Sequence, residues 1–104
     1  ASDVYKRQTL SFEPDIRFDL SAKVLYVSEQ PVPLTKSEYS ICEYLAKNRG
    51  QVFTKEQIYE AVFGFDGIGD NSTISTHIKN IRAKLEHFKI SPISTVWGIG
   101  YKWE

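Results

Sequence analysis

A regular pattern of apolar positions runs through the C-terminal third of the chain. Between Ser72 and His87, apolar residues recur at spacings of four, three and four, namely Ile74, Ile78, Ile81 and Leu85. At about 100° per residue, these positions form one stripe along a helix, and such a stripe must be buried. The pattern predicts an amphipathic helix that begins near Asn71 or Ser72 and ends around His87.

Two shorter helices are predicted upstream, and both begin in the same way. Thr35 is followed three positions later by Glu38, and Thr54 by Gln57, so each pair can form a capping box. An apolar residue before each cap, with another at the fourth helical position, adds a hydrophobic staple: Leu34 with Tyr39, and Phe53 with Ile58. The two helices are expected to end near Asn48 and near Phe63. Their expected buried residues are Tyr39, Cys42, Leu45 and Ala46 in the first helix, and Ile58, Ala61 and Val62 in the second.

Short apolar runs separated by turn residues predict strands at both ends of the chain. The N-terminal runs are LSF, IRFDL, VLYV and PVPL, which favour an antiparallel meander. Pro31 and Pro33 make the last of them an edge or a distorted strand. After Pro92, strands at 93–96 and 101–103 are expected to flank a turn at 97–100, and the pair Val52-Phe53 could add a third strand to that hairpin.

The predicted fold class is therefore α+β: a four-stranded antiparallel sheet, three helices and a C-terminal hairpin. Residues 1–8 carry no pattern and are interpreted as a linker or cloning remnant, and residues 9–104 as one domain. No apolar run approaches a membrane span, and no signal-peptide pattern opens the chain. The single cysteine, Cys42, excludes an internal disulfide and fits a reducing compartment, so cytoplasm is the expected location and a membrane is not an expected partner.

The polar side of the helix at 72–87 is the main candidate for binding. Between Ser72 and Leu85 the helix carries three cations, Lys79, Arg82 and Lys84, and no anion, although the whole chain is neutral, with 13 basic and 13 acidic residues. A cationic helix face is usually only solvated, but an ordinary surface helix interleaves both signs. Short hydroxyl side chains and asparagine can also approach base edges closely. The polar side comprises Ser72, Thr76, Lys79 and Ala83, with Thr73 and Asn80 on one flank and Ser75 and Arg82 on the other.

The sequence gives little support for a metal site, a reactive cysteine, a catalytic site or a base-stacking platform. His77 and His87 have no second ligand at metal spacing, so neither a metal nor another cofactor is expected. Cys42 lies on a buried stripe and is interpreted as inert core. No nucleophile elbow or phosphate loop is present, so an enzyme is not expected. The aromatic residues Trp97, Tyr101 and Trp103 are interpreted as hairpin packing rather than as a base-stacking platform.

The order of these elements and three of their motifs resemble the OmpR/PhoB-like winged-helix DNA-binding domain of bacterial two-component response regulators. The motifs are LTKSEYSICEYLAKNRGQVFTKEQIYEAVFG, THIKNIRAKLE and STVWGIGYKW, and the similarity extends from about Leu10 to Trp103. The resemblance implies sequence-specific binding of double-stranded DNA, with the helix at about 72–87 in the major groove and the hairpin at 93–103, the wing, on the backbone or minor groove. It implies base contacts from Ser75, Thr76 and Asn80. It implies that Ser72, Thr73, His77, Lys79 and Arg82 contact or flank phosphates, and that Thr95 and Tyr101 on the wing meet DNA.

The same resemblance implies further partners. The loop from Gly64 to Asp70 (Gly64, Phe65, Asp66, Gly67, Ile68, Gly69 and Asp70) occupies the place where the family contacts RNA polymerase. A receiver domain is expected upstream, and a tandem or symmetric dimer is expected on DNA. Two residues depart from the family pattern. Trp97 stands where many relatives carry arginine, so it is expected to pack on sugar or within the hairpin, and Asn80 stands where a basic residue is common. The alternative from another class is a winged-helix module that binds protein.

Overall fold

The computed structural model describes residues 9–12, 15–64 and 72–104, and the segment assigned to a linker, 1–8, lies outside them. The N-terminal part is a four-stranded antiparallel sheet in the order β1-β2-β3-β4. Alternate side chains of its two central strands point to one face, where Phe18 and Leu25 are fully buried opposite each other. The predicted meander is confirmed, with strands at Thr9–Phe12 (β1), Ile16–Asp19 (β2), Val24–Val27 (β3) and Gln30–Pro31 (β4).

The last strand is shorter than the sequence pattern predicts. It comprises Gln30 and Pro31, whereas residues 31–34 were expected. Val32 still donates a hydrogen bond to the Leu25 carbonyl, at 2.8 Å. Pro33 has no N–H to donate, so the ladder stops there and the chain turns into the first helix.

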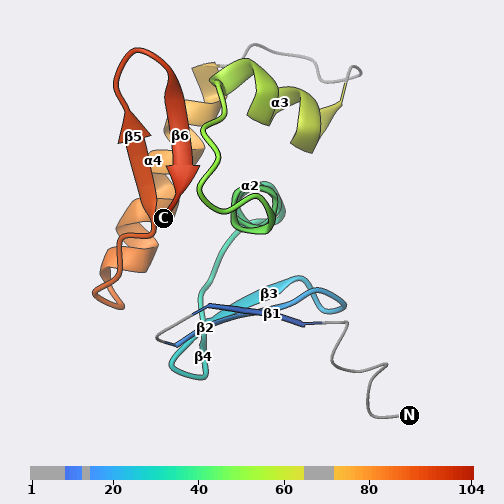
Figure 1. Ribbon diagram of the computed structural model, residues 1–104. Helices are drawn as coiled ribbons and strands as arrows, with labels where there is room; N and C mark the ends of the chain where they lie inside the picture. Colours follow the sequence, from blue (N-terminus) through green and yellow to red (C-terminus); the bar gives the residue numbers. More distant parts are fainter. Residues whose placement is uncertain (1–8, 13–14, 65–71) are drawn as a thin grey trace.

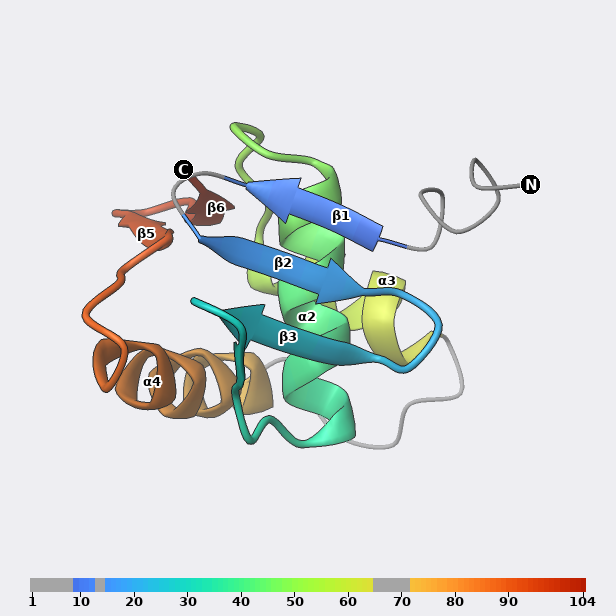
Figure 2. The same ribbon diagram turned by 90° about the horizontal axis from the view of Figure 1, so that it is seen from below.

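The helix α2, Lys36–Lys47, lies at the centre of the molecule. Figure 1 shows the sheet on one side of it and the other helices and the hairpin on the opposite side, and Figure 2 shows it crossing behind the strands. The predicted capping box is present: the Thr35 hydroxyl accepts from the Glu38 amide at 3.2 Å, and the Glu38 carboxylate accepts from the Thr35 amide at 3.0 Å. All four predicted core residues of this helix are buried, and so is Ile41, because α2 is covered on both sides.

The other two helices form a helix-turn-helix pair. The helix α3, Lys55–Phe63, begins with the predicted capping box of Thr54 and Gln57. Ile58 is buried as expected and Val62 is half-buried, but Ala61 is exposed and that prediction is wrong, because this short helix presents only a narrow face to the core. The helix α4 spans Ser72–Glu86, and all four residues of its predicted stripe are buried. It ends one residue earlier than predicted, where the Phe88 amide turns back onto the Leu85 carbonyl.

The hairpin pairs β5, Ile93–Val96, with β6, Gly100–Trp103. Phe53 joins it through a bridge to Tyr101, so the predicted third strand exists as a single bridged residue. Trp103 is buried and lies 5.7 Å from the Phe18 ring, which connects the hairpin to the N-terminal sheet in one core. Among the described residues, no helix has the length and apolar character needed to cross a bilayer.

Candidate nucleic-acid interface

The outer face of α4 lies on the surface of the molecule, opposite the buried stripe. We call this face the exposed strip, and its residues are Ser72, Thr73, Thr76, Lys79, Asn80 and Ala83, all of them exposed. Ser75, His77 and Arg82 lie on its flanks and are half-buried. The predicted polar side of the helix and its flank of Thr73 and Asn80 are therefore accessible, whereas the flank of Ser75 and Arg82 is partly packed.

Four polar side chains on this helix have their hydrogen-bonding groups available. Within the described part of the chain, the side chains of Ser75, Thr76, Lys79 and Asn80 make no hydrogen bond or ion pair with the protein. Hydroxyl and amide groups that are satisfied only by water can exchange that water for a ligand without breaking an internal contact. The centre of the exposed strip therefore offers one unpaired cation together with short donors and acceptors.

The other two cations of α4 are engaged by the protein itself. Lys84 forms an ion pair with Glu38 of α2, at 2.5 Å between Nζ and Oε1. Burial alone raises the pKa of the Glu38 carboxyl, but the hydrogen bond from Lys84 and that from the Thr35 amide outweigh it, so the pKa lies below its usual value. The local excess of positive charge on α4 is therefore smaller than the sequence indicates, because the compensating anion comes from another helix.

Arg82 connects α4 to the wing. Its Nη2 donates to the Ile93 carbonyl at 3.1 Å and to the Thr95 hydroxyl at 2.7 Å, and its guanidinium lies 5.5 Å from the centre of the Tyr101 ring. Hydrogen bonds from a charged donor are about twice as strong as neutral ones. These contacts fix the position of the hairpin relative to α4.

We expect Arg82→Ala to lower the free energy of unfolding by about 1–2 kcal/mol, because two charge-assisted hydrogen bonds are lost. Urea denaturation measures this loss. Amide hydrogen exchange of residues 93–103 should rise more than exchange in α2, since the hairpin loses its tie to α4. Thr95→Val removes only one of the two acceptors, so its effect should be smaller. Equal exchange rates in the hairpins of Arg82→Ala and the parent would contradict this role.

Both histidines pack against aromatic rings. His77 stacks on Phe63 of α3, with ring centroids 5.9 Å apart. His87, which follows the helix, contacts Phe88 edge-on. No group of histidine, cysteine and acidic residues in the described ranges could hold a metal ion. Cys42 is fully buried, and burial raises the pKa of its thiol because a thiolate there would lose its hydration.

The wing presents an apolar tip to solvent. Trp97 is 89% exposed and Ile99 is 58% exposed, and they are the only exposed large hydrophobic side chains among the described residues. Tyr101 is buried, and Thr95 is half-buried beneath Arg82. Of the two positions expected for Trp97, packing within the hairpin is excluded by its exposure. The exposure of Ile99 was not predicted, although its place between two glycines in the turn could have indicated it.

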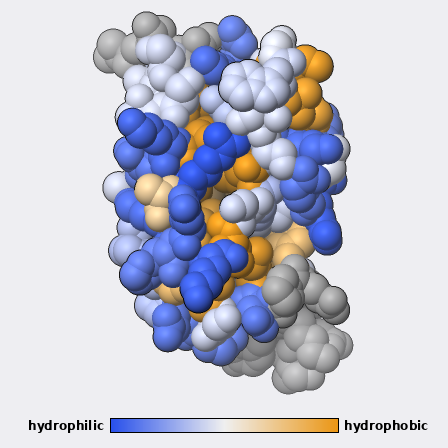
Figure 3. Space-filling view, turned by 90° about the vertical axis from the view of Figure 1, so that its left-hand side faces the viewer, coloured by the Kyte–Doolittle hydropathy of each residue, from blue (hydrophilic) through white to orange (hydrophobic). Residues whose placement is uncertain are grey.

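Figure 3 looks at the side of the molecule on which the hairpin and α4 lie. Hydrophilic surface covers much of this face, and hydrophobic surface shows in a band through its middle and again at its upper right edge. A shallow hollow of about 340 Å³ opens between the wing and the start of α3, where Lys55 and Glu56 lie beside the tip. Those two charges have opposite signs, so neither sign prevails beside the tip.

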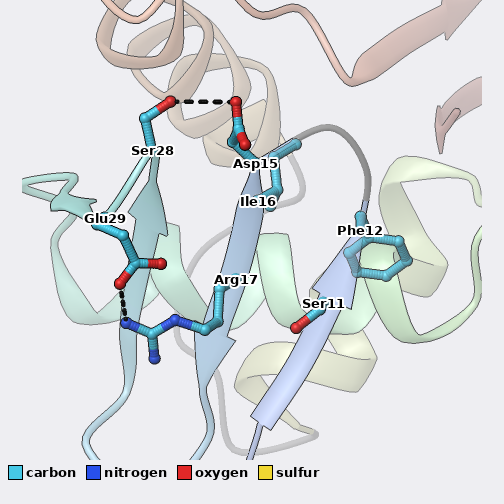
Figure 4. Close-up of a pocket in the computed structure, with 7 residues that line it drawn as sticks. All are labelled: Ser11, Phe12, Asp15, Ile16, Arg17, Ser28 and Glu29. Atoms are coloured by element: carbon cyan, nitrogen blue, oxygen red, sulfur yellow. Dashed lines mark hydrogen bonds and ion pairs between the residues drawn. The ribbon is translucent and has the colours of Figure 1, made fainter.

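A larger hollow, of about 480 Å³, lies on the N-terminal sheet (Figure 4). Its charged groups are occupied with one another: Arg17 pairs with Glu29 at 3.2 Å, and the Ser28 hydroxyl donates to the Asp15 carboxylate at 3.4 Å. These are surface contacts of the kind that contribute little energy, and they converge on no common point. The hollow does not form a catalytic constellation.

The loop expected to contact polymerase is described only at its first residue. Gly64 ends α3 with a positive φ of 72°, and its amide donates to the Glu60 carbonyl at 2.9 Å. Its ψ of −173° places Gly64 in a backbone region that is open essentially to glycine alone, which explains why a glycine ends this helix. Phe65, Asp66, Gly67, Ile68, Gly69 and Asp70 lie outside the described residues.

The fold, the exposed strip and the adjoining hairpin together define a winged-helix domain of the DNA-binding class, and solved structures agree. The DNA-binding domain of CpxR from E. coli matches with a TM-score of 0.77 and 27% identity, covering 91% of this chain and 94% of that one. DrrB, an OmpR/PhoB homologue of Thermotoga maritima, matches with a TM-score of 0.79 and 28% identity, covering 92% and 44%. The AdeR DNA-binding domain, solved in complex with an intercistronic region, has the same fold, with a TM-score of 0.80 at 23% identity, covering 90% and 98%.

The family model described as transcriptional regulatory protein, C terminal, matches residues 29–103. SpaR of Bacillus subtilis is 45% identical over 87 residues, which are 84% of this chain and 40% of that protein. The response regulator SaeR of Staphylococcus epidermidis is 38% identical over 101 residues, which are 95% of this chain and 44% of that protein. The chain thus spans less than half the length of these curated relatives. It belongs to the C-terminal family of transcriptional regulatory proteins and is a DNA-binding output domain of the OmpR/PhoB type, which regulates transcription without catalysing a reaction.

Proposed function

We propose that this domain reads double-stranded DNA in a sequence-specific manner, with α4 in the major groove and the wing, residues 93–103, on the backbone and minor groove. The observation that carries the proposal is the exposed strip beside the hairpin, in which the side chains of Thr76, Lys79 and Asn80 make no hydrogen bond or ion pair with the described part of the protein. An α-helix fits the width of the major groove of B-DNA. The hairpin, held to α4 by Arg82, would then follow the adjacent backbone.

Ser75, Thr76 and Asn80 are the proposed base-reading residues. Asn80 and Thr76 lie one turn apart on the exposed strip, and Ser75 lies on the flank that faces the wing. The side-chain amide of asparagine can pair with N6 and N7 of adenine, but it lacks the paired donors that suit O6 and N7 of guanine. We therefore expect Asn80 to favour adenine at the position it contacts.

The proposed phosphate contacts surround these residues. Lys79 is the unpaired cation of the strip, and Arg82 keeps Nε and Nη1 available because its two hydrogen bonds use Nη2. The remaining phosphate or flanking contacts are assigned to Ser72, Thr73, His77, Thr95 and Tyr101. Such contacts fix the register of a protein on DNA without reading its sequence.

With so few cations available, one copy should bind with modest affinity and strong salt dependence. Binding as a tandem or symmetric pair on repeated half-sites would raise the affinity through effective concentration. In the full-length cytoplasmic protein, we propose that a receiver domain controls this pairing and that the loop at 64–70 contacts RNA polymerase. The pairing on DNA, its control by a receiver domain and the polymerase contact are proposed because the chain belongs to this family.

A winged-helix module that binds protein is the second candidate. The exposed apolar tip and the neutral charge of the chain favour it. The two functions differ in their response to salt. Contacts with phosphate weaken as salt rises because the release of condensed counterions into a more concentrated solution gains less entropy, whereas apolar contact with a protein changes little.

Two substitutions on α4 test the DNA function. Asn80→Ala should cost about 1–3 kcal/mol on the preferred sequence and relax the preference at one base pair. Lys79→Ala should weaken specific and scrambled duplexes alike and lower the slope of log K against log salt by about one. The measurement is a fluorescence-anisotropy titration at several salt concentrations, with duplexes selected from a random pool. Lys89→Ala, an exposed lysine beyond the end of α4, is the matched control and should leave binding unchanged.

If Asn80→Ala loses the same affinity for the selected duplex as for the scrambled duplex, the base-reading role of Asn80 is refuted. If no duplex is recovered from the pool at low salt, DNA binding by the isolated domain is refuted and the protein-binding module is favoured.

A further inference from the structure

The wing tip, residues 97–99, has the composition of a binding surface rather than of a simple turn. The tip is closed by the pair Val96 and Gly100, by a hydrogen bond of 3.0 Å from the Ile99 amide to the Val96 carbonyl, and by Gly98 with φ of 80°. A three-residue turn needs no large side chains, yet this one displays an indole and an isoleucine. A tryptophan side chain can bury about 150–250 Å².

The hairpin does not need these two side chains for its own core. Its inward face is already filled by Ile93, Tyr101 and Trp103, all of them buried. Trp97 and Ile99 lie beyond that core, and no ring contact or cation–π contact involves Trp97 within the described residues. Folding therefore does not explain why an indole stands at the tip.

The tip also lacks the charge that would attract it to phosphate. No residue from Thr95 to Tyr101 is charged. The neighbouring Lys55 and Glu56 have opposite signs. A contact made by this tip must therefore be mainly apolar, and it should depend little on salt.

The position of the tip identifies the surface that it can meet. Arg82 holds β5 against α4, and Figure 1 shows the tip and the first half of α4 at the same end of the molecule. In the binding mode proposed above, α4 occupies a major groove and the wing lies on the backbone and minor groove, so the tip would meet the neighbouring minor groove of the same duplex. The walls of that groove are deoxyribose rings, which are the apolar part of the DNA backbone.

We propose that Trp97, with Ile99, packs against deoxyribose in the minor groove and makes this wing select a wide or deformable groove beside the major-groove site. An arginine at such a position is attracted to the narrow groove of A-tracts by their enhanced negative potential. A neutral and bulky indole gains nothing from that potential and needs room, which flexible TA and CA/TG steps supply. The proposal deepens the DNA-binding function proposed above and depends on it.

The two tryptophans of the chain allow a direct test, because Trp97 is 89% exposed whereas Trp103 is 1% exposed. Acrylamide should quench mainly Trp97 in the free domain. Saturation with a selected duplex should shield Trp97, so that the quenching constant falls severalfold. Trp97→Phe leaves only Trp103, and its weak quenching should not change when DNA is added. If acrylamide quenches Trp97 equally well in the saturated complex, the proposal is overturned.

A panel of duplexes tests the preference for groove shape. The duplexes share one selected major-groove site, and under the wing they carry either an A-tract or TA and CA steps. The parent should bind the duplex with the flexible flank at least about threefold more tightly than the duplex with the A-tract. Trp97→Arg should instead bind the A-tract duplex more tightly. Trp97→Ala should bind both flanks equally, and about tenfold more weakly than the parent binds its preferred flank. For Trp97→Ala, the slope of log K against log salt should equal that of the parent. Thermal unfolding of each variant checks that this exposed position does not alter the fold.

The outcomes separate this proposal from the broader function. One outcome is that Lys79→Ala reduces the slope of log K against log salt, but the parent binds both flanks with equal affinity. In that case DNA binding stands and the role of Trp97 is refuted. If no duplex binds at low salt, both proposals fail. If Trp97→Ala equals the parent on every duplex, the tip serves some other partner and the groove assignment is wrong.

Discussion

Gly100→Ala is expected to destabilise the domain by at least about 3 kcal/mol, which is a large share of the stability of a domain of this size. A Cβ at this position would lie 1.9 Å from the Phe53 carbonyl oxygen, 2.7 Å from its carbon and 2.9 Å from the Thr54 Cα. All three are backbone atoms, so no side chain can rotate to make room. Either the bridge between Phe53 and Tyr101 opens or the entire hairpin shifts.

Gly98→Ala is the matched control, two residues away in the wing tip. A Cβ there would meet nothing within 4 Å, but φ is 80°, so the expected cost is about 1 kcal/mol from the left-handed backbone alone. Urea denaturation of the two variants measures the difference. Equal losses would show that backbone strain rather than the close approach decides the cost, and would contradict the account given for Gly100.

The close approach at Gly100 also matters for function. The bridge at Phe53 lies immediately before the capping box of α3, so it ties the wing to the start of the helix-turn-helix pair. A shifted hairpin would carry Trp97 away from its position beside α4. We therefore expect Gly100→Ala protein that still folds to bind duplexes with a flexible flank and with an A-tract equally well. It should keep the part of its DNA affinity that comes from α4.

Local sequence patterns predicted the elements because each pattern carries its own physical cause. The spacing of Ile74, Ile78, Ile81 and Leu85 permits only one buried face on a helix, and the two capping boxes define where α2 and α3 begin. The exposed strip follows directly, since it is the opposite side of the stripe. Most of the candidate interface could therefore be located without coordinates.

Contacts between distant residues could not be predicted in this way. Glu38 and Lys84 are 46 positions apart, and Arg82 meets acceptors 11 and 13 positions away. The sequence shows three cations on one helix, but it does not show that two of them are used internally. The exposure of Ala61 was missed for the same reason, because the breadth of the contact made by α3 depends on how its neighbours pack.

Lys84→Met is expected to cost about 3 kcal/mol of unfolding free energy at pH 7. The Glu38 side chain is 4% exposed, and removal of its partner leaves a buried carboxylate supported mainly by the Thr35 amide. Removing one partner of a buried ion pair commonly costs about 3–5 kcal/mol, and the low end applies because the Lys84 side chain is 30% exposed. Lys47→Met is the matched control: Lys47 pairs with Glu43 at the surface with its side chain 50% exposed, so its loss should cost less than about 0.5 kcal/mol.

The pH dependence of this effect distinguishes a charge effect from lost packing. The pKa of Glu38 in the folded parent lies below its usual value of 4.5, so its carboxylate contributes stability that is fully present above about pH 4.5 and is lost as the pH falls through the folded pKa. Without Lys84, burial should raise that pKa, so the variant loses stability as the pH rises. The difference in unfolding free energy between the parent and Lys84→Met should therefore be small near pH 3 and larger at pH 6. A difference of the same size at both pH values, measured by urea denaturation, would show that the loss comes from altered packing of the side chain at position 84 and not from the charge of Glu38.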